Sequence, residues 1–132
     1  MAIVMESTHR ALGDVVVVAP VGRIDYLVAA EFERTLVPLL DPGSGSRRGL
    51  VVDFSGVDYI SSVGLRVLMI ATRSIRSRGA RLAAAALQPA VQEIFSISRF
   101  DRVVEIFPTV RAALSAISPA SAEAYGGEGR TR

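Results

Sequence analysis

The chain has 132 residues, of which half are hydrophobic and 21% are charged, and its formal net charge is +2. This length is typical of a single domain, and the apolar content suffices for one hydrophobic core, so a wholly disordered chain is excluded. Cysteine is absent and His9 is the single histidine. Disulfide scaffolds and cysteine nucleophiles are therefore excluded, and little is left for a histidine-based metal centre or a catalytic triad. All 15 basic residues are arginine, which excludes mechanisms that need a lysine.

No segment of the sequence is long and apolar enough to cross a membrane. Its longest apolar run, Val15–Val21, contains Pro20 and is far shorter than the ~20 residues of a spanning helix. The first residues lack the basic region and apolar stretch of a signal peptide. We therefore expect a cytoplasmic protein without membrane insertion.

The N-terminal part of the chain predicts a hairpin. Ile3–Thr8 is a candidate first strand, Ala11–Asp14 supplies turn residues, and Val15–Val21 is a β-branched run typical of a second strand. Gly22–Asp25 ends that strand. The hairpin should therefore occupy the first 25 residues.

A helix, a loop and a buried strand are predicted next. Asp25 is a candidate N-cap for a helix over Tyr26–Leu40, in which apolar residues recur at helical spacing. Residues 41–48 are rich in Gly, Ser and Pro, as expected of a loop. Gly49–Phe54 is a nearly continuous apolar run, which is typical of a central strand buried on both faces.

The clearest helix in the sequence follows a connector over Ser55–Ile60. It is predicted over Ser62–Arg78, because one side carries an apolar stripe and another side carries arginines. Gly79 is predicted to end it as a C′ residue. The stripe consists of Leu65, Leu68, Thr72 and Ile75.

The last third of the chain predicts a strand over Arg81–Leu87, a helix over Pro89–Ser98, a strand over Val103–Phe107 and a helix over Thr109–Ile117. Residues 118–132, rich in Ser, Ala, Gly and Arg, read as a flexible tail.

This order of elements predicts a single α/β domain over residues 1–117. After the hairpin, strands alternate with helices, a pattern that requires a mostly parallel sheet with right-handed crossovers. We expect a five-stranded, mostly parallel sheet with an N-terminal antiparallel hairpin, flanked by about four helices.

Two consecutive serines, Ser61 and Ser62, stand where the connector becomes a helix. The start of a helix offers unpaired N–H groups and the positive end of the dipole, so a phosphate on a serine there would meet donors. Gly64 is unfavourable in a first turn, which indicates close approach of another backbone or a partner. Spacing alone favours a simpler interpretation, in which a serine caps the helix and Gly64 relieves crowding.

The stretch Val51–Leu65 resembles the signature of STAS domains, particularly that of the anti-sigma factor antagonists of bacteria. The signature is an apolar strand ending in Asp-Leu-Ser, a connector, and Asp-Ser-Ser-Gly-Leu at the start of a helix. Gly22–Asp25 is similar to the family's Gly-x-Leu-Asp, and Gln88–Phe95 is similar to its proline-led third helix. The resemblance covers residues 3–117 and implies the STAS fold.

The resemblance also implies a phosphorylation site. Carried over by position, the serine that a partner kinase phosphorylates is Ser62. Ser61 replaces the usual aspartate, which makes it an alternative acceptor, and Val63 replaces the usual second serine or threonine. Asp25 matches an aspartate that would orient the hydroxyl or the kinase, although capping of the first helix explains it equally well. The implied partner-binding residues are Asp25, Ser61, Ser62, Val63, Gly64 and Arg66.

The function implied by the resemblance is that of an anti-sigma factor antagonist acting by partner switching. The unmodified chain would bind an anti-sigma factor serine kinase, phosphorylation would release it, and a serine phosphatase would reverse the change. The chain would then be a substrate rather than an enzyme, without cofactor, metal or nucleic acid. The alternative is a non-switching STAS subunit or scaffold, for example of a lipid-transport ATPase or a secretion-control system.

Enzymatic and nucleic-acid-binding functions have weaker support in the sequence. No histidine lies near Ser62 and no Gly-x-Ser-x-Gly elbow is present. The spacing of Asp25, Asp53 and Asp58 matches no metal-binding loop. The arginines of the helix after Ser62 have no interleaved aromatic residues, as expected of a solvated helix face.

Overall fold

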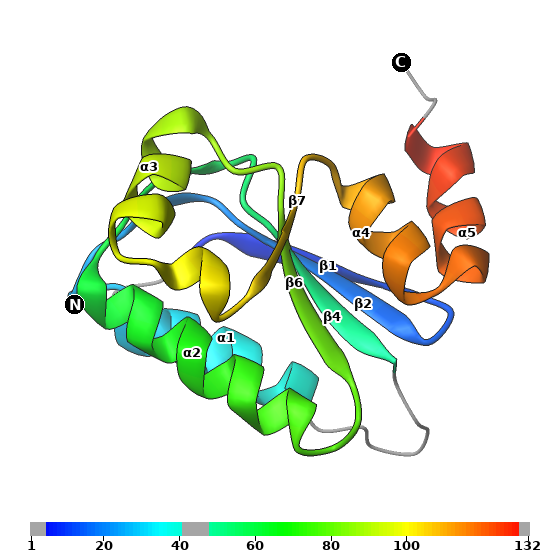
Figure 1. The fold of residues 1–132 in the computed structure, drawn as a ribbon, viewed down its shortest axis with the longest axis horizontal. Coiled ribbons are helices and arrows are strands. Elements are labelled where there is room, and N and C mark those ends of the chain that lie inside the picture. The colour runs from blue at the N-terminus through cyan, green and yellow to red at the C-terminus, as the bar shows by residue number, and fades with distance from the viewer. Residues whose placement is uncertain (1–4, 41–47, 130–132) are drawn as a thin grey trace.

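The computed structural model describes residues 5–40 and 48–129; residues 1–4, 41–47 and 130–132 lie outside the described part. The described residues form a five-stranded sheet in the order β1-β2-β4-β6-β7, shown in Figure 1. Only the β1–β2 pair is antiparallel, so the predicted mostly parallel sheet with an antiparallel hairpin is confirmed. The strands are β1 (Ser7–Leu12), β2 (Val15–Pro20), β4 (Gly49–Asp53), β6 (Arg81–Ala85) and β7 (Glu105–Phe107).

Helices cover both faces of this sheet (Figure 1). One face packs against α1 (Ala29–Leu40), α2 (Ser62–Arg76) and α3 (Pro89–Ile97), and the other face packs against α4 (Val110–Ile117) and α5 (Pro119–Gly129). Successive residues of a strand point to opposite faces, so each central strand needs apolar residues throughout. On β2, Val16 and Val18 belong to the first core, and Val15 and Val17 belong to the second.

A second, two-stranded sheet occupies part of the predicted connector. β3 (Gly22–Ile24) pairs in parallel with β5 (Val57–Ile60), so the segment predicted only as a connector contains a strand over Val57–Ile60. Val57 and Ile60 are buried, whereas Asp58 between them is exposed. This four-residue pattern is too short to distinguish a strand from a loop in the sequence.

The hairpin begins later in the chain than predicted. β1 starts at Ser7, and the turn is confined to Gly13 and Asp14, so the predicted strand over Ile3–Thr8 overlaps β1 only at its last two residues. Gly13 has a φ of +65°, a conformation that glycine adopts without steric cost. The glycine therefore fixes the position of the turn.

Helix ends also differ from the predictions by a few residues. α1 begins at Ala29 because residues 26–28 form a turn. α2 ends at Arg76 and is closed by hydrogen bonds from Gly79 N–H to Arg76 O and from Ala80 N–H to Ile75 O, 3.0 and 3.1 Å long. With a φ of +80° at Gly79, these bonds form a Schellman motif, which confirms the prediction that Gly79 ends the helix as a C′ residue.

Two further element bounds differ near the end of the sheet. β6 ends at Ala85 rather than Leu87, and the predicted strand over Val103–Phe107 is shortened to Glu105–Phe107. A single 3₁₀ turn over Phe100–Arg102 precedes it and supplies Phe100 to the core.

The predicted flexible tail is wrong over residues 119–129, which form helix α5. Ser121 and Ala122 are buried against the rest of the domain. The Ser121 hydroxyl donates a hydrogen bond to the Leu12 carbonyl and lies 3.3 Å from Asp14 Oδ1, which ties α5 to the β1–β2 turn. Small polar residues can thus dock a helix closely, although they leave no apolar stripe in the sequence.

We expect the Ser121→Ala substitution to lower the free energy of unfolding by about 1–2 kcal/mol, because it removes a buried hydrogen bond. The matched control is Ser115→Ala on the exposed side of α4, which should change that free energy by less than about 0.5 kcal/mol. Urea denaturation of both variants measures the difference. Equal stability of the two variants would show that α5 is not held by this contact.

Candidate functional site

The two serines lie at a corner that the small sheet builds. β3 and β5 are parallel and end together, with Ile24 paired to Ile60. The chain continues from these ends into Asp25 and into Ser61, and the Ser61 N–H donates a 2.8 Å hydrogen bond to the Ile24 carbonyl. We call residues 25–27 and 61–66 the serine corner. Segments far apart in the sequence therefore meet there.

The two serines have different surroundings. Ser61 is the N-cap of α2, and its hydroxyl oxygen accepts a 3.1 Å hydrogen bond from the Gly64 N–H. Ser62 is the first residue of the helix and is exposed, and its hydroxyl forms no hydrogen bond with any described residue. The capping role is thus filled by Ser61, which leaves the Ser62 hydroxyl accessible.

Gly64 allows α2 to approach β3 closely. A Cβ at this position would lie 2.8 Å from Ile60 Cγ1, 2.9 Å from Ile24 Cγ2 and 3.3 Å from the Ile24 carbonyl oxygen. These distances are shorter than ordinary van der Waals contact. A residue with a side chain would push the start of α2 away from the strand, so close packing within the domain explains this glycine.

Asp25 caps the turn that leads into α1. Its Oδ1 accepts a 3.1 Å hydrogen bond from the Val28 N–H, and the residue is half-buried. Asp25 therefore caps the turn that precedes α1, and its predicted role as N-cap of a helix that begins at Tyr26 is wrong because α1 begins at Ala29. A role of Asp25 in orienting a serine hydroxyl stays a prediction.

Exposed apolar side chains accompany the serines. Tyr26 is 71% exposed, Leu27 is 55% exposed and Val63 is 45% exposed, and Arg66 is exposed as well. Leu27 lies within the predicted helix over Tyr26–Leu40, but the prediction is wrong at its start because residues 26–28 form a turn. No signal in the sequence marks Tyr26 and Leu27 as surface residues of this corner, since only the pairing of β3 with β5 brings them there.

The three aspartates considered for a metal site do not assemble one. Asp53 Oδ1 instead accepts a 2.9 Å hydrogen bond from the Ser55 N–H. Among the side chains of residues 5–39 and 48–125, no three His, Asp or Glu converge as ligands. In the same residues, no helix has both the length and the apolar character needed to cross a bilayer.

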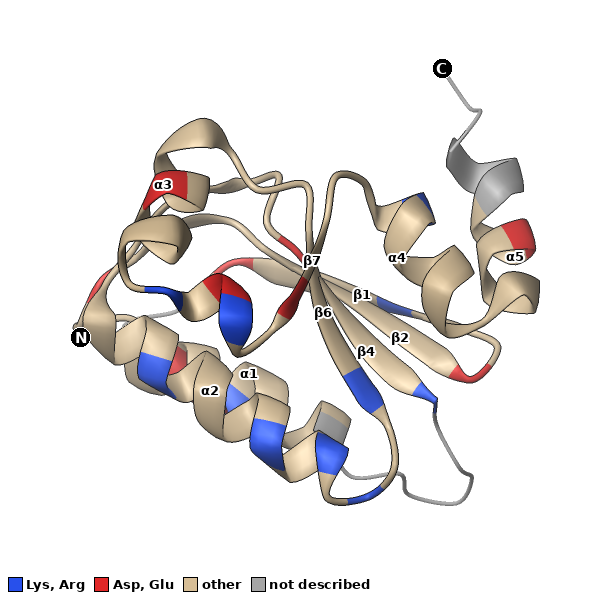
Figure 2. Cartoon of the chain, in the orientation of Figure 1, with Lys and Arg blue, Asp and Glu red and all other residues tan. Residues whose placement is uncertain are grey.

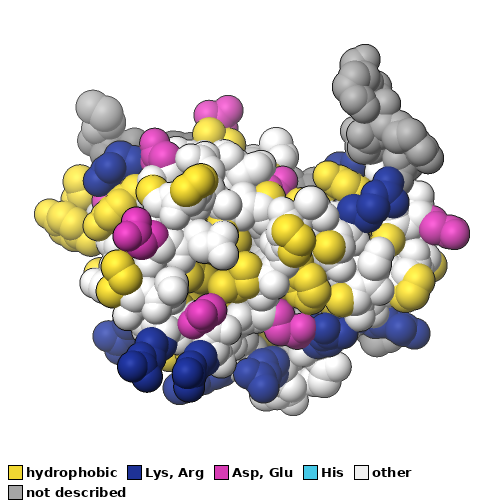
Figure 3. All heavy atoms as spheres, turned by 45° about the horizontal axis from the view of Figure 1, so that its top comes forward, with side chains coloured by type: hydrophobic (Ala, Val, Ile, Leu, Met, Phe, Trp, Pro, Cys, Tyr) yellow, Lys and Arg dark blue, Asp and Glu magenta, His cyan; other side chains and the backbone are white. Residues whose placement is uncertain are grey.

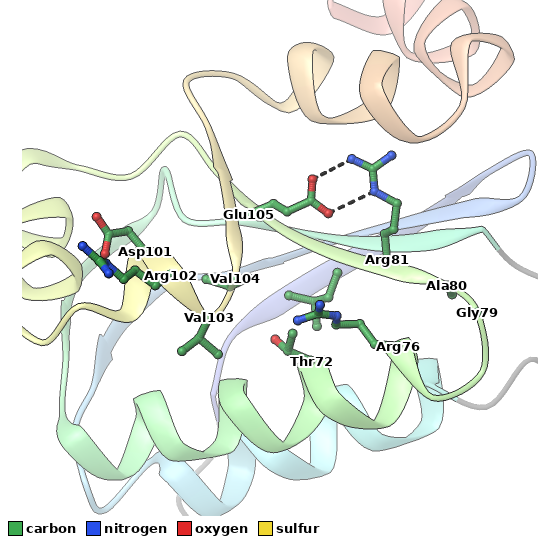
Figure 4. A pocket seen from close by; sticks show the side chains of 11 residues that line it. Thr72, Arg76, Gly79, Ala80, Arg81, Asp101, Arg102, Val103, Val104 and Glu105 are labelled. Carbon is green, nitrogen blue, oxygen red and sulfur yellow. Dashed lines mark hydrogen bonds and ion pairs between the residues drawn. The ribbon is translucent and has the colours of Figure 1, made fainter.

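A cavity of about 510 Å³ lies toward the C-terminal end of α2, away from the serines (Figure 4). It is lined by Thr72 and Arg76 of α2, by the start of β6 and by the segment that leads into β7. Along α2, at 1.5 Å per residue, Thr72 and Arg76 lie about 15 and 21 Å from Ser62. The cavity is therefore not part of the serine corner.

An ion pair occupies one side of that cavity. Arg81 Nε and Nη2 donate to the two carboxylate oxygens of Glu105 over 3.0 and 2.6 Å, and Arg81 Nη1 donates to the Ala116 carbonyl. The hydrogen bonds from Arg81 hold the pKa of Glu105 below its usual value. The pair links β6 to the edge strand β7, which is a structural role.

Comparisons with known proteins place this geometry among STAS domains. The sequence profile of the STAS domain family matches residues 6–113. The chain is 29% identical over 116 residues to BtrV of Bordetella bronchiseptica, whose provisional name is anti-sigma factor antagonist; the alignment covers 88% of this chain and 97% of BtrV.

Solved structures show the same fold. The structure of an anti-sigma factor antagonist from Mycobacterium paratuberculosis is 25% identical, with a TM-score of 0.75 over 86% of this chain and 93% of that one. The unphosphorylated form of the anti-sigma factor antagonist SpoIIAA is 14% identical, with a TM-score of 0.71 over 86% of this chain and 97% of that one. At this identity, the likeness to SpoIIAA concerns the fold alone.

We expect Ser61→Ala and Ser62→Ala to differ in their effect on stability. Ser61→Ala removes the N-cap and should lower the free energy of unfolding by about 1 kcal/mol, whereas Ser62→Ala should change it by less than about 0.5 kcal/mol. Thermal and urea denaturation compare the two. A larger loss for Ser62→Ala would mean that the cap is assigned to the wrong serine.

Gly64→Ala should destabilise the domain by about 1–3 kcal/mol through overpacking, more than the ~1 kcal/mol that alanine gains in helix propensity. The loss of stability caused by Gly64→Ala should be smaller in an Ile60→Ala background, because that substitution removes Ile60 Cγ1, the atom nearest to the new methyl group. Gly79→Ala, which meets no atom within 4 Å, is the control, and its cost should be the same in both backgrounds. Denaturation of the wild type, of Ile60→Ala and of both glycine variants in each background tests this, and a background-independent cost of Gly64→Ala would contradict the packing explanation.

Proposed function

Because the chain belongs to the STAS domain family, we propose that it is an anti-sigma factor antagonist that acts by partner switching. The unmodified chain binds an anti-sigma factor serine kinase at the serine corner, phosphorylation of Ser62 releases it, and a serine phosphatase restores binding. Relatives along nearly the whole chain are named as antagonists of this kind, which supports the general function. In this function the chain is a binding partner and a substrate, and the chemistry belongs to the kinase.

The observation that carries the proposal is the accessible hydroxyl of Ser62 on the first turn of α2. A kinase needs a serine whose oxygen can reach the γ-phosphate, and Ser62 meets this requirement without unfolding of the helix. Ser61 is less suited, because its oxygen already accepts the Gly64 N–H and phosphorylation would disturb the cap. The proposed acceptor is therefore Ser62, with Ser61 as the alternative.

A phosphate at this position changes the partner surface far more than the fold. It adds a charge of about −1.5 to −2 at neutral pH. Negative charge near a helix N-terminus is favourable, and the first turn of α2 contains no acidic residue that would repel it. The domain thus tolerates the phosphate, whereas a partner that packs on Val63 and Leu27 would have to desolvate it. Release of the partner follows from that desolvation and from repulsion of partner carboxylates.

The missing aspartate before Ser62 favours the second candidate function, a non-switching STAS subunit or scaffold. Ser61 stands where the family signature has an aspartate, so no carboxylate of that signature lies beside the acceptor hydroxyl. In a non-switching subunit the same corner contacts a partner, but Ser62 is never modified. The two functions differ in one measurable property, which is phosphorylation.

We expect transfer of phosphate to Ser62 when the chain is incubated with ATP and the purified anti-sigma factor serine kinases of its source organism, one at a time. Phosphopeptide mapping should place the phosphate on Ser62, and Ser62→Ala should abolish labelling. Labelling that survives Ser62→Ala and disappears in Ser61→Ala would move the site to Ser61. Binding without labelling by any of these kinases would favour the non-switching function.

Titration calorimetry with the same kinase tests the charge switch. Ser62→Ala should keep the affinity of the unmodified chain, whereas Ser62→Asp should lower it roughly 10- to 1000-fold, because an unpaired charge enters the contact. Thermal melts should show equal stability of both variants. Equal affinities in equally stable variants would exclude a charge switch at this position.

A further inference from the structure

The solvent-facing side of α2 carries a regular row of exposed residues that begins at Ser62. At 100° per residue, positions 62, 66, 70 and 73 fall within one sector of the helix about 80° wide. All of them are exposed, and the opposite side of α2 is buried. This spacing is the one by which a helix presents a single face to a partner. We call Val63, Arg66, Ile70 and Arg73, with Val37 of α1, the α2 stripe.

The charged residues of α2 are all basic, whereas Glu33 of α1 lines the neighbouring groove together with Val37 and Ile70. α2 contains Arg66, Arg73 and Arg76 and no acidic residue. Figure 2 shows basic residues recurring along α2, and Figure 3 shows a row of basic side chains along the lower edge of the molecule. Within the described residues, neither Arg66 nor Arg73 forms an ion pair. Their charges are therefore available to a partner.

Helix stability accounts for only some of these arginines. Arg73 and Arg76 lie in the last turn, where a positive charge favours the helix dipole. Arg66 lies in the second turn, near the positive end of the helix, where a cation gains nothing from the dipole. Its position suits an interaction outside the domain.

Apolar side chains lie between the charges. Ile70 is 50% exposed and Val37 is 52% exposed, and both line a small groove between α1 and α2 together with Leu36 and Val67. Val63 adds a third half-exposed aliphatic side chain nearer the serine corner. A merely solvated helix face has no need for branched aliphatic residues at these positions, and covering them would add hydrophobic stabilisation to a complex.

We propose that the α2 stripe docks on a partner protein whose contact surface has carboxylates around an apolar centre. The inference rests on the proposed function, because the stripe continues the serine corner about 16 Å along α2, from Ser62 to Arg73. The arginines pair with the carboxylates, and the apolar centre covers Ile70 and Val37. A nucleic acid backbone would pair with the arginines but would leave these aliphatic groups uncovered, so the stripe favours a protein.

This partner chemistry also explains why a phosphate on Ser62 would weaken binding. Arg66 lies four residues after Ser62, a spacing at which side chains on a helix meet. A phosphate of about −1.5 to −2 then reverses the charge that Arg66 presents, to about −0.5 to −1 together. The surface around Ser62 and Arg66 is then negative instead of positive, and it repels the carboxylates of the partner.

The occupant of the stripe can be identified in cells of the source organism. The full chain carries the photo-crosslinker benzoylphenylalanine at position 70, and a second version carries it at position 115 on α4 as a control. We expect position 70 to crosslink a protein through an acidic peptide, and the crosslink to disappear when Arg66→Glu and Arg73→Glu are added. A crosslink that survives both charge reversals, or that is no stronger than at position 115, overturns the proposal.

Affinity measurements with the crosslinked protein complete the test. Arg66→Glu and Arg73→Glu should each lower its affinity roughly 10- to 100-fold, since like charges then face each other. The control Arg111→Glu, on the opposite face of the sheet, should change it less than about twofold. Binding of a DNA duplex or of anionic phosphatidylserine vesicles that depends on Arg66 and Arg73, with no effect of the reversals on the protein, also overturns the proposal.

The outcomes separate this inference from the proposed function. An acidic, charge-sensitive partner that is not an anti-sigma factor supports the stripe and refutes the proposed function. If the bound protein is an anti-sigma factor and its affinity for the chain does not change with Arg66→Glu and Arg73→Glu, the proposed function is supported and the docking role of the α2 stripe is refuted.

Discussion

The close contact between the start of α2 and strand β3 is the constraint on which the serine corner depends. The Ser61 N–H is bound to the Ile24 carbonyl, and Gly64 leaves room for the Ile24 side chain. Together they fix the direction in which α2 leaves the small sheet. That direction turns Leu65 and Leu68 into the core and Ser62 and Arg66 to the solvent. A change at this contact would therefore move every exposed side chain of the helix at once.

Because this contact fixes the orientation of α2, the two sides of the helix have different roles. The buried side of α2 closes the core against β4 and β6, and the exposed side carries the accessible serine and the arginines. Since these roles use different residues, substitutions on the outer side should have nearly additive, small effects on stability. A binding surface built in this way can be altered without loss of the fold.

The sequence predicted those elements that have a strong physical signature. The buried strand at Gly49–Asp53 was recognisable because both of its faces need apolar residues, and α2 was recognisable from its apolar stripe and from the glycine that closes it. The pair of serines was recognisable at the start of that helix, and the family resemblance selected Ser62. The assignment of the cap to Ser61 required coordinates, because both serines are chemically suited to it.

Elements whose stability comes from distant contacts could not be predicted. β3 and β5 are three and four residues long, and they are strands only because they pair with each other. The exposed position of Leu27 follows from that pairing. α5 has no apolar stripe, and the hydrogen bond of Ser121 to the β1–β2 turn joins residues 109 positions apart.

That long separation has a consequence for the order in which the molecule forms. During synthesis α5 leaves the ribosome after the β1–β2 turn that receives it, and it contains several glycines and few apolar residues. Docking it onto a domain that has already formed closes no long loop of disordered chain, because the intervening residues are fixed by then. α5 should consequently fold last and open first, as a local unit whose amide protons exchange faster than those of β4 and β6.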